Sequence, residues 1–393
     1  MGHPWELLCG RPCDHSVQMS TGSPRDCISS HAALQMNVKN FGCTHPLYQC
    51  VTVLRLLHLR STNPTIWHKL SALESHCQQR QQTQRYEDDR VAVAQFARTF
   101  FKLSEFSEEE ILRACGIIQA RARGLKEEAL CEAGAQVNGH EVPVTEPAHI
   151  AVYDTASLLE HHCRPNCSKS FTNDGALIIW AAVPIPQGTH LSICYSDALW
   201  GTASRRHHLA ETKFFWCTCE RCADPTECNT FFSTQHCLEE SCEGFLLPEE
   251  PLKEGRAVKE ASWWHCTACP ARVSADRVHA TAESVGQQLA AMRKGDPASC
   301  ERFVRECITL LHPNHYYLTD VRLALAQLYG QDHADGLRGT PEDELRKKAR
   351  LCHDVLSLVD QLAPGQPLPL PSHSLSSKHF VSQYQVHCII GTV

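Results

Sequence analysis

The sequence lacks a surplus of positive charge. Its 393 residues carry 37 Lys and Arg against 44 Asp and Glu, which gives a formal net charge of −7. Tight nucleic-acid binding needs a basic surface, and this composition supplies none. Direct sequence-specific nucleic-acid binding is therefore disfavoured, and any role at chromatin would run through protein contacts. The length is sufficient for several domains with a sizeable core.

Two kinds of apolar segment are also missing. No run of eighteen or more apolar residues occurs, and the N-terminus has no basic segment followed by an apolar one. A membrane-spanning helix needs the first, and a secretory leader needs the second. We therefore expect an intracellular protein, in the nucleus or the cytoplasm, that does not insert into a membrane. We also expect a monomer.

Cysteine, in contrast, is abundant, with 23 residues. The chain is long and its cysteines are closely clustered, which favours thiolate–metal sites over disulfides. Cys217, Cys219 and Cys222 are too close for ordinary disulfide pairing, but their spacing suits one tetrahedral zinc ion that still needs a fourth ligand. Cys163 is our candidate for that ligand.

A second set of cysteines follows the first. It consists of two pairs, separated from each other by about two dozen residues: Cys237 and Cys242, then Cys266 and Cys269. This is the layout of a zinc ribbon, in which each pair supplies two thiolates. The flanking His236 and His265 are weaker ligand candidates. We therefore predict two Zn²⁺ ions per chain.

The segment around Cys163 resembles a known family. Residues 160–167 read Glu-His-His-Cys-Arg-Pro-Asn-Cys, residues 192–197 read Ser-Ile-Cys-Tyr-Ser-Asp, and the cysteine triplet follows. These blocks resemble the Asn-His-Ser-Cys-x-Pro-Asn, Ile-Ser-Tyr-x-Asp and Cys-x-Cys-x-x-Cys blocks of SET-domain protein lysine methyltransferases. The continuation at 221–227, Arg-Cys-Ala-Asp-Pro-Thr-Glu, resembles the SET-and-MYND (SMYD) group, particularly its arthropod SmydA branch. The likeness covers roughly residues 50 to 365.

The resemblance implies an α+β fold: small twisted β-sheets of SET type with a helical insert, a zinc-bound post-SET region and a C-terminal α-helical array. It divides the chain into a poorly defined N-terminal segment (1–50), the helical insert (51–130), the SET core (131–210), the cysteine-rich zinc region (211–275), a tetratricopeptide-like helical domain (276–365) and a disordered tail (366–393).

Local patterns place some of these elements more closely. A serine followed by acidic residues in the run 104–110 predicts the start of a helix that carries Ile111, Leu112, Cys115 and Ile118 on one face. A second helix is predicted from residue 205 to 215. Apolar runs rich in β-branched residues at 150–159 and 176–183 predict short strands joined by turns.

The resemblance also implies the chemistry, which is transfer of the sulfonium methyl group of S-adenosylmethionine to a lysine amine of a protein, histone or other. Tyr195 matches the family tyrosine at the methyl-transfer pore; the alternative is a strand tyrosine whose hydroxyl is capped by a hydrogen bond. Asn138, His161 and Phe215 match positions that contact the cofactor, although a lone Asn-Gly, as at 138–139, is more often a hairpin turn.

Several family features are absent or altered. Glu160 replaces the family asparagine, His162 the serine and Lys213 a tyrosine often found before the triplet. The Gly-x-Gly turn of the SET N-lobe and a MYND finger are not found in residues 1–50, whose cysteines form no paired knuckles. We therefore expect weak cofactor binding and little turnover by this chain. The alternative is a noncatalytic zinc-binding SET pseudoenzyme that acts as an interaction scaffold or transcriptional regulator.

Overall fold

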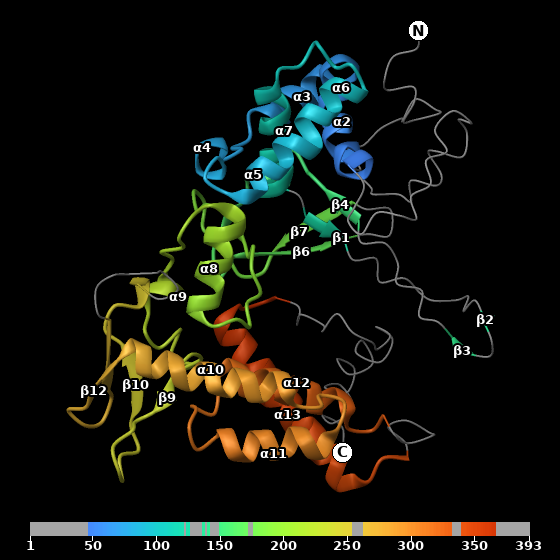
Figure 1. The fold of residues 1–393 in the computed structure, drawn as a ribbon. Helices are drawn as coiled ribbons and strands as arrows, with labels where there is room; N and C mark the ends of the chain where they lie inside the picture. The colour runs from blue at the N-terminus through green and yellow to red at the C-terminus, as the bar shows by residue number, and fades with distance from the viewer. Residues whose placement is uncertain are drawn as a thin grey trace. The chain divides into compact units, whose positions relative to one another are not determined.

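The computed structural model of the protein (Figure 1) describes residues 46–121, 123–125, 136–137, 140–141, 149–171, 176–253, 262–331 and 339–366. The predicted N-terminal segment and tail lie almost entirely outside these residues. The chain divides into two units. The first contains the described residues of Met1–Leu158 and Ser170–Ile178, and the second contains those of Leu159–Lys169 and Ile179–Pro369.

The first unit is mainly helical and also carries short strands. Its elements are α2 (Pro46–Thr62), α3 (Pro64–Ser71), α4 (Cys77–Arg80), α5 (Gln84–Asp89), the π-helix η3 (Arg90–Gln95), α6 (Phe96–Phe100), α7 (Glu108–Arg121), β1 (Arg123–Leu125), β2 (Gln136–Val137), β3 (His140–Glu141), β4 (His149–Ala151) and the 3₁₀ turn η4 (Ala156–Leu158). β1 pairs with β4 and β2 with β3, both antiparallel.

The core of the first unit forms where helices α2 and α7 meet the shorter helices. Leu54 and Leu57 of α2 are buried with Leu70 of α3 and Ile111 of α7. Gly116 lets α7 approach the loop between α3 and α4, because a Cβ atom at this position would lie 2.3 Å from the Ser75 carbonyl oxygen. The apolar spacing predicted for this helix therefore serves helix–helix packing.

Helix α7 begins three residues later than the first serine of the run 104–110 suggests. Ser107 is the cap: its Oγ accepts the Glu110 backbone N–H at 3.1 Å, and the Glu110 carboxylate accepts the Ser107 N–H at 2.8 Å. This reciprocal pair is a capping box, which satisfies donors that the first turn leaves without intrahelical partners. The predicted helix is confirmed, and Ser107 rather than Ser104 starts it.

Replacing Ser107 with alanine is expected to lower the free energy of unfolding of the first unit by about 1 kcal/mol, because the Glu110 N–H loses its acceptor. Chemical denaturation of the full chain, followed by circular dichroism, measures this change. Ser104→Ala is the matched control at an exposed neighbouring serine and should change stability by less than about 0.5 kcal/mol. An equal loss in both variants would contradict the assignment of the cap.

The second unit contains the remaining elements. They are β5 (Glu160–His161), β8 (Ser192–Ile193), α8 (Thr202–Lys213), α9 (Glu220–Ala223), β9 (Gln235–His236), β10 (Phe245–Pro248), the 3₁₀ turn η5 (Pro251–Lys253), β11 (Trp263–Cys266), β12 (Arg272–Ser274), α10 (Ala275–Ala291), α11 (Pro297–Cys307), α12 (Tyr316–Leu328) and α13 (Glu342–Leu362). Strands β6 (Cys167–Phe171) and β7 (Leu177–Ala181) form a two-stranded sheet, and each has residues in both units.

Four helices, α10 to α13, follow the four-stranded sheet β12-β11-β10-β9 in the second unit and lie together in Figure 1, coloured orange to red. Val285 of α10, Phe303 of α11 and Leu325 of α12 belong to one buried cluster. Asp296 caps α11 by accepting the Ala298 and Ser299 N–H groups. A helical region after residue 275 was predicted, and it is present.

The loop that precedes the sheet pairs with the start of the helical array through backbone hydrogen bonds. The His236 N–H donates to the Leu310 carbonyl at 2.9 Å, His312 N–H to Thr234 at 3.1 Å and Tyr316 N–H to Phe232 at 2.9 Å. Asn314 Nδ2 also donates to the Thr230 carbonyl. We call these two segments, residues 230–236 and 310–316, the junction.

The mixed helix and sheet composition confirms the α+β class. The strand predicted at 176–183 is present as β7, but the run 150–159 is strand only at its start. Beyond it, the Asp154 carboxylate accepts the Thr155 N–H at 2.8 Å and a turn follows. Asp and Thr side chains commonly divert the backbone into turns in this way. None of the described helices has the length and apolar character that a membrane span requires.

Candidate metal centres and cofactor-contacting residues

The structure brings the first predicted set of cysteines together. The sulfurs of Cys163, Cys217, Cys219 and Cys222 all lie within 4.8 Å of one another. Cys163 Sγ lies 3.8 Å from Cys217 Sγ and 3.5 Å from Cys222 Sγ, much farther than the roughly 2.05 Å of a disulfide. A tetrahedral zinc ion with Zn–S bonds of about 2.3 Å places its sulfurs about 3.8 Å apart. The geometry fits zinc.

Local structure explains how distant cysteines converge here. Cys163 follows β5, which pairs in parallel with β8. The Asn166 side chain clamps the same two segments, because its Oδ1 accepts the Ser192 N–H and its Nδ2 donates to the His190 carbonyl, both at 2.8 Å. Helix α8 ends at Lys213, and its C-cap residue Phe214, with a φ of 61°, turns the chain toward the cysteine triplet.

Electrostatics favour the thiolate form of Cys163 in this cluster. Cys163 is fully buried, yet hydrogen bonds with the sulfurs of Cys217, Cys219 and Cys222 hold the pKa of the Cys163 thiol far below its usual range. The thiolate is the form of cysteine that binds zinc. Hydrogen bonds with Cys163 in turn raise the pKa values of the Cys217 and Cys222 thiols, so these contacts favour the thiolate at Cys163 and not at every cysteine of the cluster.

The second set of cysteines converges at the end of the four-stranded sheet. The sulfurs of Cys237, Cys242, Cys266 and Cys269 lie within 4.8 Å of one another. Cys237 and Cys269 are 3.6 Å apart, as are Cys242 and Cys266. A Cβ atom at Gly244 would lie 2.5 Å from the Cys266 sulfur, so glycine is needed there. Neither flanking histidine is in this cluster, which also fits zinc.

Two of the three residues expected to contact the cofactor lie together beside the first cluster. The ring centroids of His161 and Phe215 are 5.8 Å apart, and those of His161 and Tyr195 are 5.3 Å apart. His161 Nδ1 accepts the Tyr195 N–H at 3.0 Å. In a neutral imidazole Nε2 therefore carries the proton, and it lies 3.2 Å from Cys163 Sγ.

The hydroxyl of Tyr195 donates a hydrogen bond to the Leu159 carbonyl oxygen. Tyr195 lies two residues beyond the end of β8 and not in a strand, but its hydroxyl is capped by a hydrogen bond, as the alternative interpretation expects. A phenol that donates its proton can still accept through its oxygen. Glu160, which replaces the family asparagine, is exposed and lies 2.9 Å from His190 Nδ1. Asn138, the third expected cofactor contact, lies outside the described residues.

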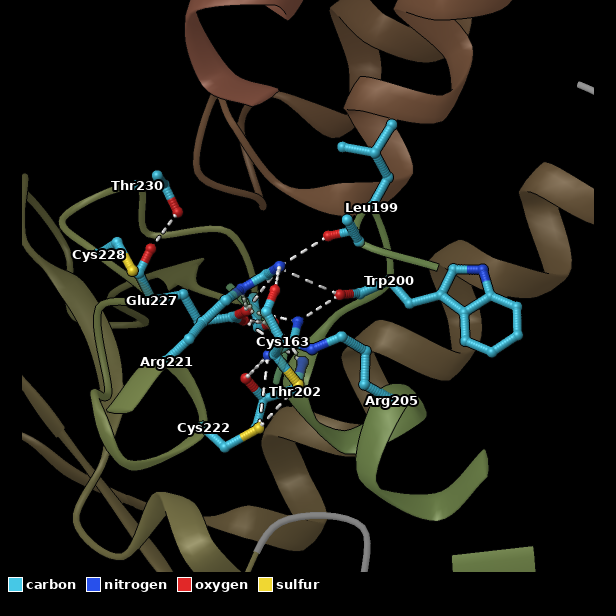
Figure 2. Close-up of polar contacts among 12 residues, drawn as sticks. Cys163, Leu199, Trp200, Thr202, Arg205, Arg221, Cys222, Glu227, Cys228 and Thr230 are labelled. Atoms are coloured by element: carbon cyan, nitrogen blue, oxygen red, sulfur yellow. Dashed lines mark hydrogen bonds and ion pairs between the residues drawn. The ribbon is translucent and has the colours of Figure 1, made fainter. Parts of the chain in front are cut away.

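A buried charge network next to the first cluster was not predicted from the sequence. Arg205 and Arg221 are fully buried and converge on the Glu227 carboxylate, at 2.7 Å and 3.1 Å (Figure 2). Burial alone would raise the pKa of Glu227, but the two guanidinium groups hold this pKa below the ordinary value of a glutamate. The run Arg-Arg-His-His at 205–208 looks like an exposed helix face, so only the resemblance at 221–227 could have drawn attention to this network.

The turn that carries Glu227 into this network has an unusual backbone. Glu227, Cys228 and Asn229 all have positive φ values, of 48°, 63° and 59°, a conformation that residues other than glycine rarely adopt. The Asp224 carboxylate accepts the Thr226 and Cys228 N–H groups at 2.8 Å and 2.7 Å. These bonds hold the turn and fix the carboxylate between the two arginines.

Comparison with known proteins shows which proteins the chain is similar to. No family model matches it. The chain is 28% identical over 240 residues to the SET domain-containing protein SmydA-8, isoform B, of Drosophila melanogaster. The matched segment covers 60% of this chain and 50% of that protein. Isoform A is 25% identical over 321 residues, 80% of this chain and 62% of that protein.

A third relative is the histone-lysine N-methyltransferase SMYD3 of Homo sapiens, 35% identical over 140 residues, which is 35% of this chain and 30% of that protein. The match thus spans 50% to 62% of the SmydA-8 isoforms and less of SMYD3. These similarities make the chain a homologue of the SMYD-type SET-domain proteins that resembles the SmydA branch.

Proposed function

We propose that the chain acts as a protein-lysine N-methyltransferase of the SMYD type, with S-adenosylmethionine as methyl donor and a protein lysine, histone or other, as acceptor. The observation that carries this proposal is the convergence of Tyr195, His161 and Phe215 beside the first cysteine cluster. The relatives support it, because one of them is a histone-lysine N-methyltransferase.

The described residues fit part of a cofactor site. When bound, S-adenosylmethionine supplies an activated methyl group on a sulfonium sulfur. The rings of Phe215 and His161 offer aromatic surface for its adenine. His161 also holds the Tyr195 backbone in place through Nδ1, so the position of Tyr195 is coupled to that of the ring pair.

The hydrogen bond of Tyr195 defines what its hydroxyl can do. Because its proton is donated to Leu159, the phenol oxygen can accept an N–H from the substrate amine and hold its lone pair in line with the methyl group. Transfer requires the neutral amine, so the ammonium must first lose a proton to solvent. Phe215 and His161 would hold the cofactor, whose sulfonium would supply the methyl group to the amine that Tyr195 orients.

Replacing Tyr195 with phenylalanine is expected to reduce methyl transfer at least about tenfold, near 1.4 kcal/mol of barrier, because the amine loses the group that orients it. The measurement is transfer of labelled methyl from S-adenosylmethionine to histone and peptide lysines. Calorimetric titration with the cofactor is the control, since Phe should leave its affinity unchanged. Because we expect little turnover by this chain, the outcome that would remove Tyr195 from the mechanism is an equal rate in the two proteins that is clearly above the background without protein.

The second candidate function is a noncatalytic scaffold that retains the metal clusters. The exposed Glu160 favours it, because a carboxylate paired with His190 stands where the family has a cofactor-contacting amide. A chain that holds its metal, shows no calorimetric binding of S-adenosylmethionine and transfers no methyl group would establish this function. A cofactor dissociation constant below about 1 μM, worth roughly 8 kcal/mol, would exclude it.

A further inference from the structure

The four sulfurs of the second cysteine cluster form two close pairs. Cys237 Sγ lies 3.6 Å from Cys269 Sγ, and Cys242 Sγ lies 3.6 Å from Cys266 Sγ. Cys237 and Cys242 lie between β9 and β10, whereas Cys266 ends β11 and Cys269 precedes β12. Each close pair therefore joins one strand connection to the other. A disulfide within a pair requires its sulfurs to approach by about 1.5 Å.

One member of each pair lines an open groove. Cys242 and Cys269 are half-buried and line a groove with a volume of about 780 Å³. Their partners, Cys266 and Cys237, are not among the residues that line this groove, and Cys266 is only 7% exposed. A small reagent that enters the groove therefore meets Cys242 and Cys269 first.

The first cluster is less accessible. Cys163, Cys217 and Cys222 are buried, and Cys219 is the one half-buried member of that set. Cys163 and Cys222 have no exposed surface. The oxidation of a cysteine depends on both its thiolate character and its exposure. Two clusters with the same four thiolate ligands should therefore differ in their reactivity toward an oxidant.

Hydrogen peroxide is an oxidant that suits the groove. Three exposed glutamates line it, and their carboxylates repel anionic reagents but not a small neutral one: Glu239, Glu240 and Glu243. We propose that the second cluster is an oxidation site for peroxide. In this site Cys242 and Cys269 react first, and Cys266 and Cys237 then form a disulfide with each of them.

The chemistry at the first pair has two steps. The Cys242 thiolate attacks one peroxide oxygen, so that a sulfur–oxygen bond forms, the oxygen–oxygen bond breaks and hydroxide leaves. The Cys266 thiolate then attacks the sulfenic sulfur, a sulfur–sulfur bond forms and a second hydroxide leaves. The two thiolates lose two electrons, and one peroxide gains them. Cys269 and Cys237 react with a second peroxide in the same way.

Oxidation of both pairs removes all four thiolates of the second cluster. Four thiolates and two peroxides give two disulfides and four hydroxides, and a disulfide sulfur no longer serves as a thiolate ligand. The cluster then cannot hold zinc. A dithiol reductant restores the four thiolates by exchange, so the change is reversible when zinc is supplied again.

The test exposes the zinc-loaded full chain to hydrogen peroxide in small molar excess. A chromogenic chelator measures released zinc, with a sample that receives no peroxide as the blank. Free thiols are then alkylated, and the disulfides are mapped by peptide mass spectrometry. We expect release of one ion at least tenfold faster than the other, with disulfides Cys237–Cys269 and Cys242–Cys266. Equal release, faster oxidation of the first cluster, or disulfides between Cys237 and Cys242 would overturn the proposal.

Trapping of the sulfenic acid tests which cysteine of each pair reacts first, and it needs no substitution. Dimedone added with the peroxide should label Cys242 and Cys269 at least tenfold more than Cys266 and Cys237. Cys228 is the internal control, because it is half-buried but belongs to neither cluster, and burial raises the pKa of its thiol. Labelling of Cys228 to the same extent would show that exposure alone decides and would overturn the assignment.

A variant tests the second step. Cys266→Ser removes the thiolate that closes the first disulfide, so the dimedone adduct at Cys242 should increase at least fivefold. Cys228→Ser is the matched control and should leave zinc release and the adduct unchanged. An unchanged adduct in the Cys266 variant would contradict its role. Should that variant fail to fold, the disulfide map and the trapping in the unsubstituted chain still decide.

This inference does not rest on methyl transfer. Its readouts are the disulfide map, the sulfenic adducts and the released zinc, none of which requires S-adenosylmethionine or a protein substrate. A chain that transfers no methyl group but forms the two expected disulfides would support the oxidation site. A chain that transfers methyl groups through Tyr195 but forms neither disulfide would refute the oxidation site alone.

Discussion

Replacing Cys163 with serine is expected to reduce the zinc content from two ions per chain to one and to unfold the segment around the first cluster. A structural zinc ion contributes on the order of 10 kcal/mol to folding. The Cys163 sulfur is fully buried, contacts two of the other three sulfurs and accepts a hydrogen bond from His161. Loss of the Cys163 sulfur therefore disturbs both the metal site and the packing of the His161 and Phe215 rings.

Elemental analysis of freshly purified protein measures this outcome, and peptide mapping shows which cysteines become reactive. Cys167→Ser is the matched control, because Cys167 is a buried cysteine of the same segment that does not belong to either cluster. It should retain two ions. Loss of the ion bound by Cys237 and its partners in the Cys163 variant would show that the ligand assignment is wrong.

Replacing Glu227 with glutamine is expected to lower the free energy of unfolding of the second unit by about 3–5 kcal/mol. The amide keeps the shape of the side chain but removes the buried carboxylate that Arg205 and Arg221 share. The guanidinium groups of Arg205 and Arg221 then lie close together without a carboxylate between them. Denaturant unfolding of the metal-loaded chain measures the change.

An exposed ion pair in the same unit provides the control for this prediction. Arg272 binds Glu249 through two hydrogen bonds of 2.7 Å, but both side chains are exposed to solvent in substantial part. Glu249→Gln should therefore cost no more than about 1 kcal/mol. If Glu227→Gln costs as little, the buried network does not stabilise the fold in the way proposed here.

The sequence is a good guide to the metal clusters, because metal ligation depends on local spacing. The close spacing of Cys217, Cys219 and Cys222 is enough to predict a shared metal site. The spacing within and between the two zinc-ribbon pairs predicts the second site in the same way. Cys163 was only a candidate for the fourth ligand, since nothing in spacing links residues so far apart, and the structure brings its sulfur to the other three. Whether these clusters hold zinc in solution stays a prediction.

The features that sequence analysis missed depend on burial, which a single sequence does not reveal. Arg205 and Arg206 look like charges on a solvated helix, yet both are buried. The start of α7 was ambiguous because Ser104 and Ser107 both precede acidic residues, and the reciprocal bonds with Glu110 decide between them. The strand expected over 150–159 gives way to a turn at Asp154, where a side chain competes with sheet pairing.

The junction between residues 230–236 and 310–316 has a consequence for the order in which the chain folds. Its backbone bonds join segments on either side of the second cluster and of helices α10 and α11. Contacts between segments so distant in the chain form late, after the intervening residues are ordered. The supply of zinc during synthesis should therefore set when α12 can dock, although that helix contains no metal ligand itself.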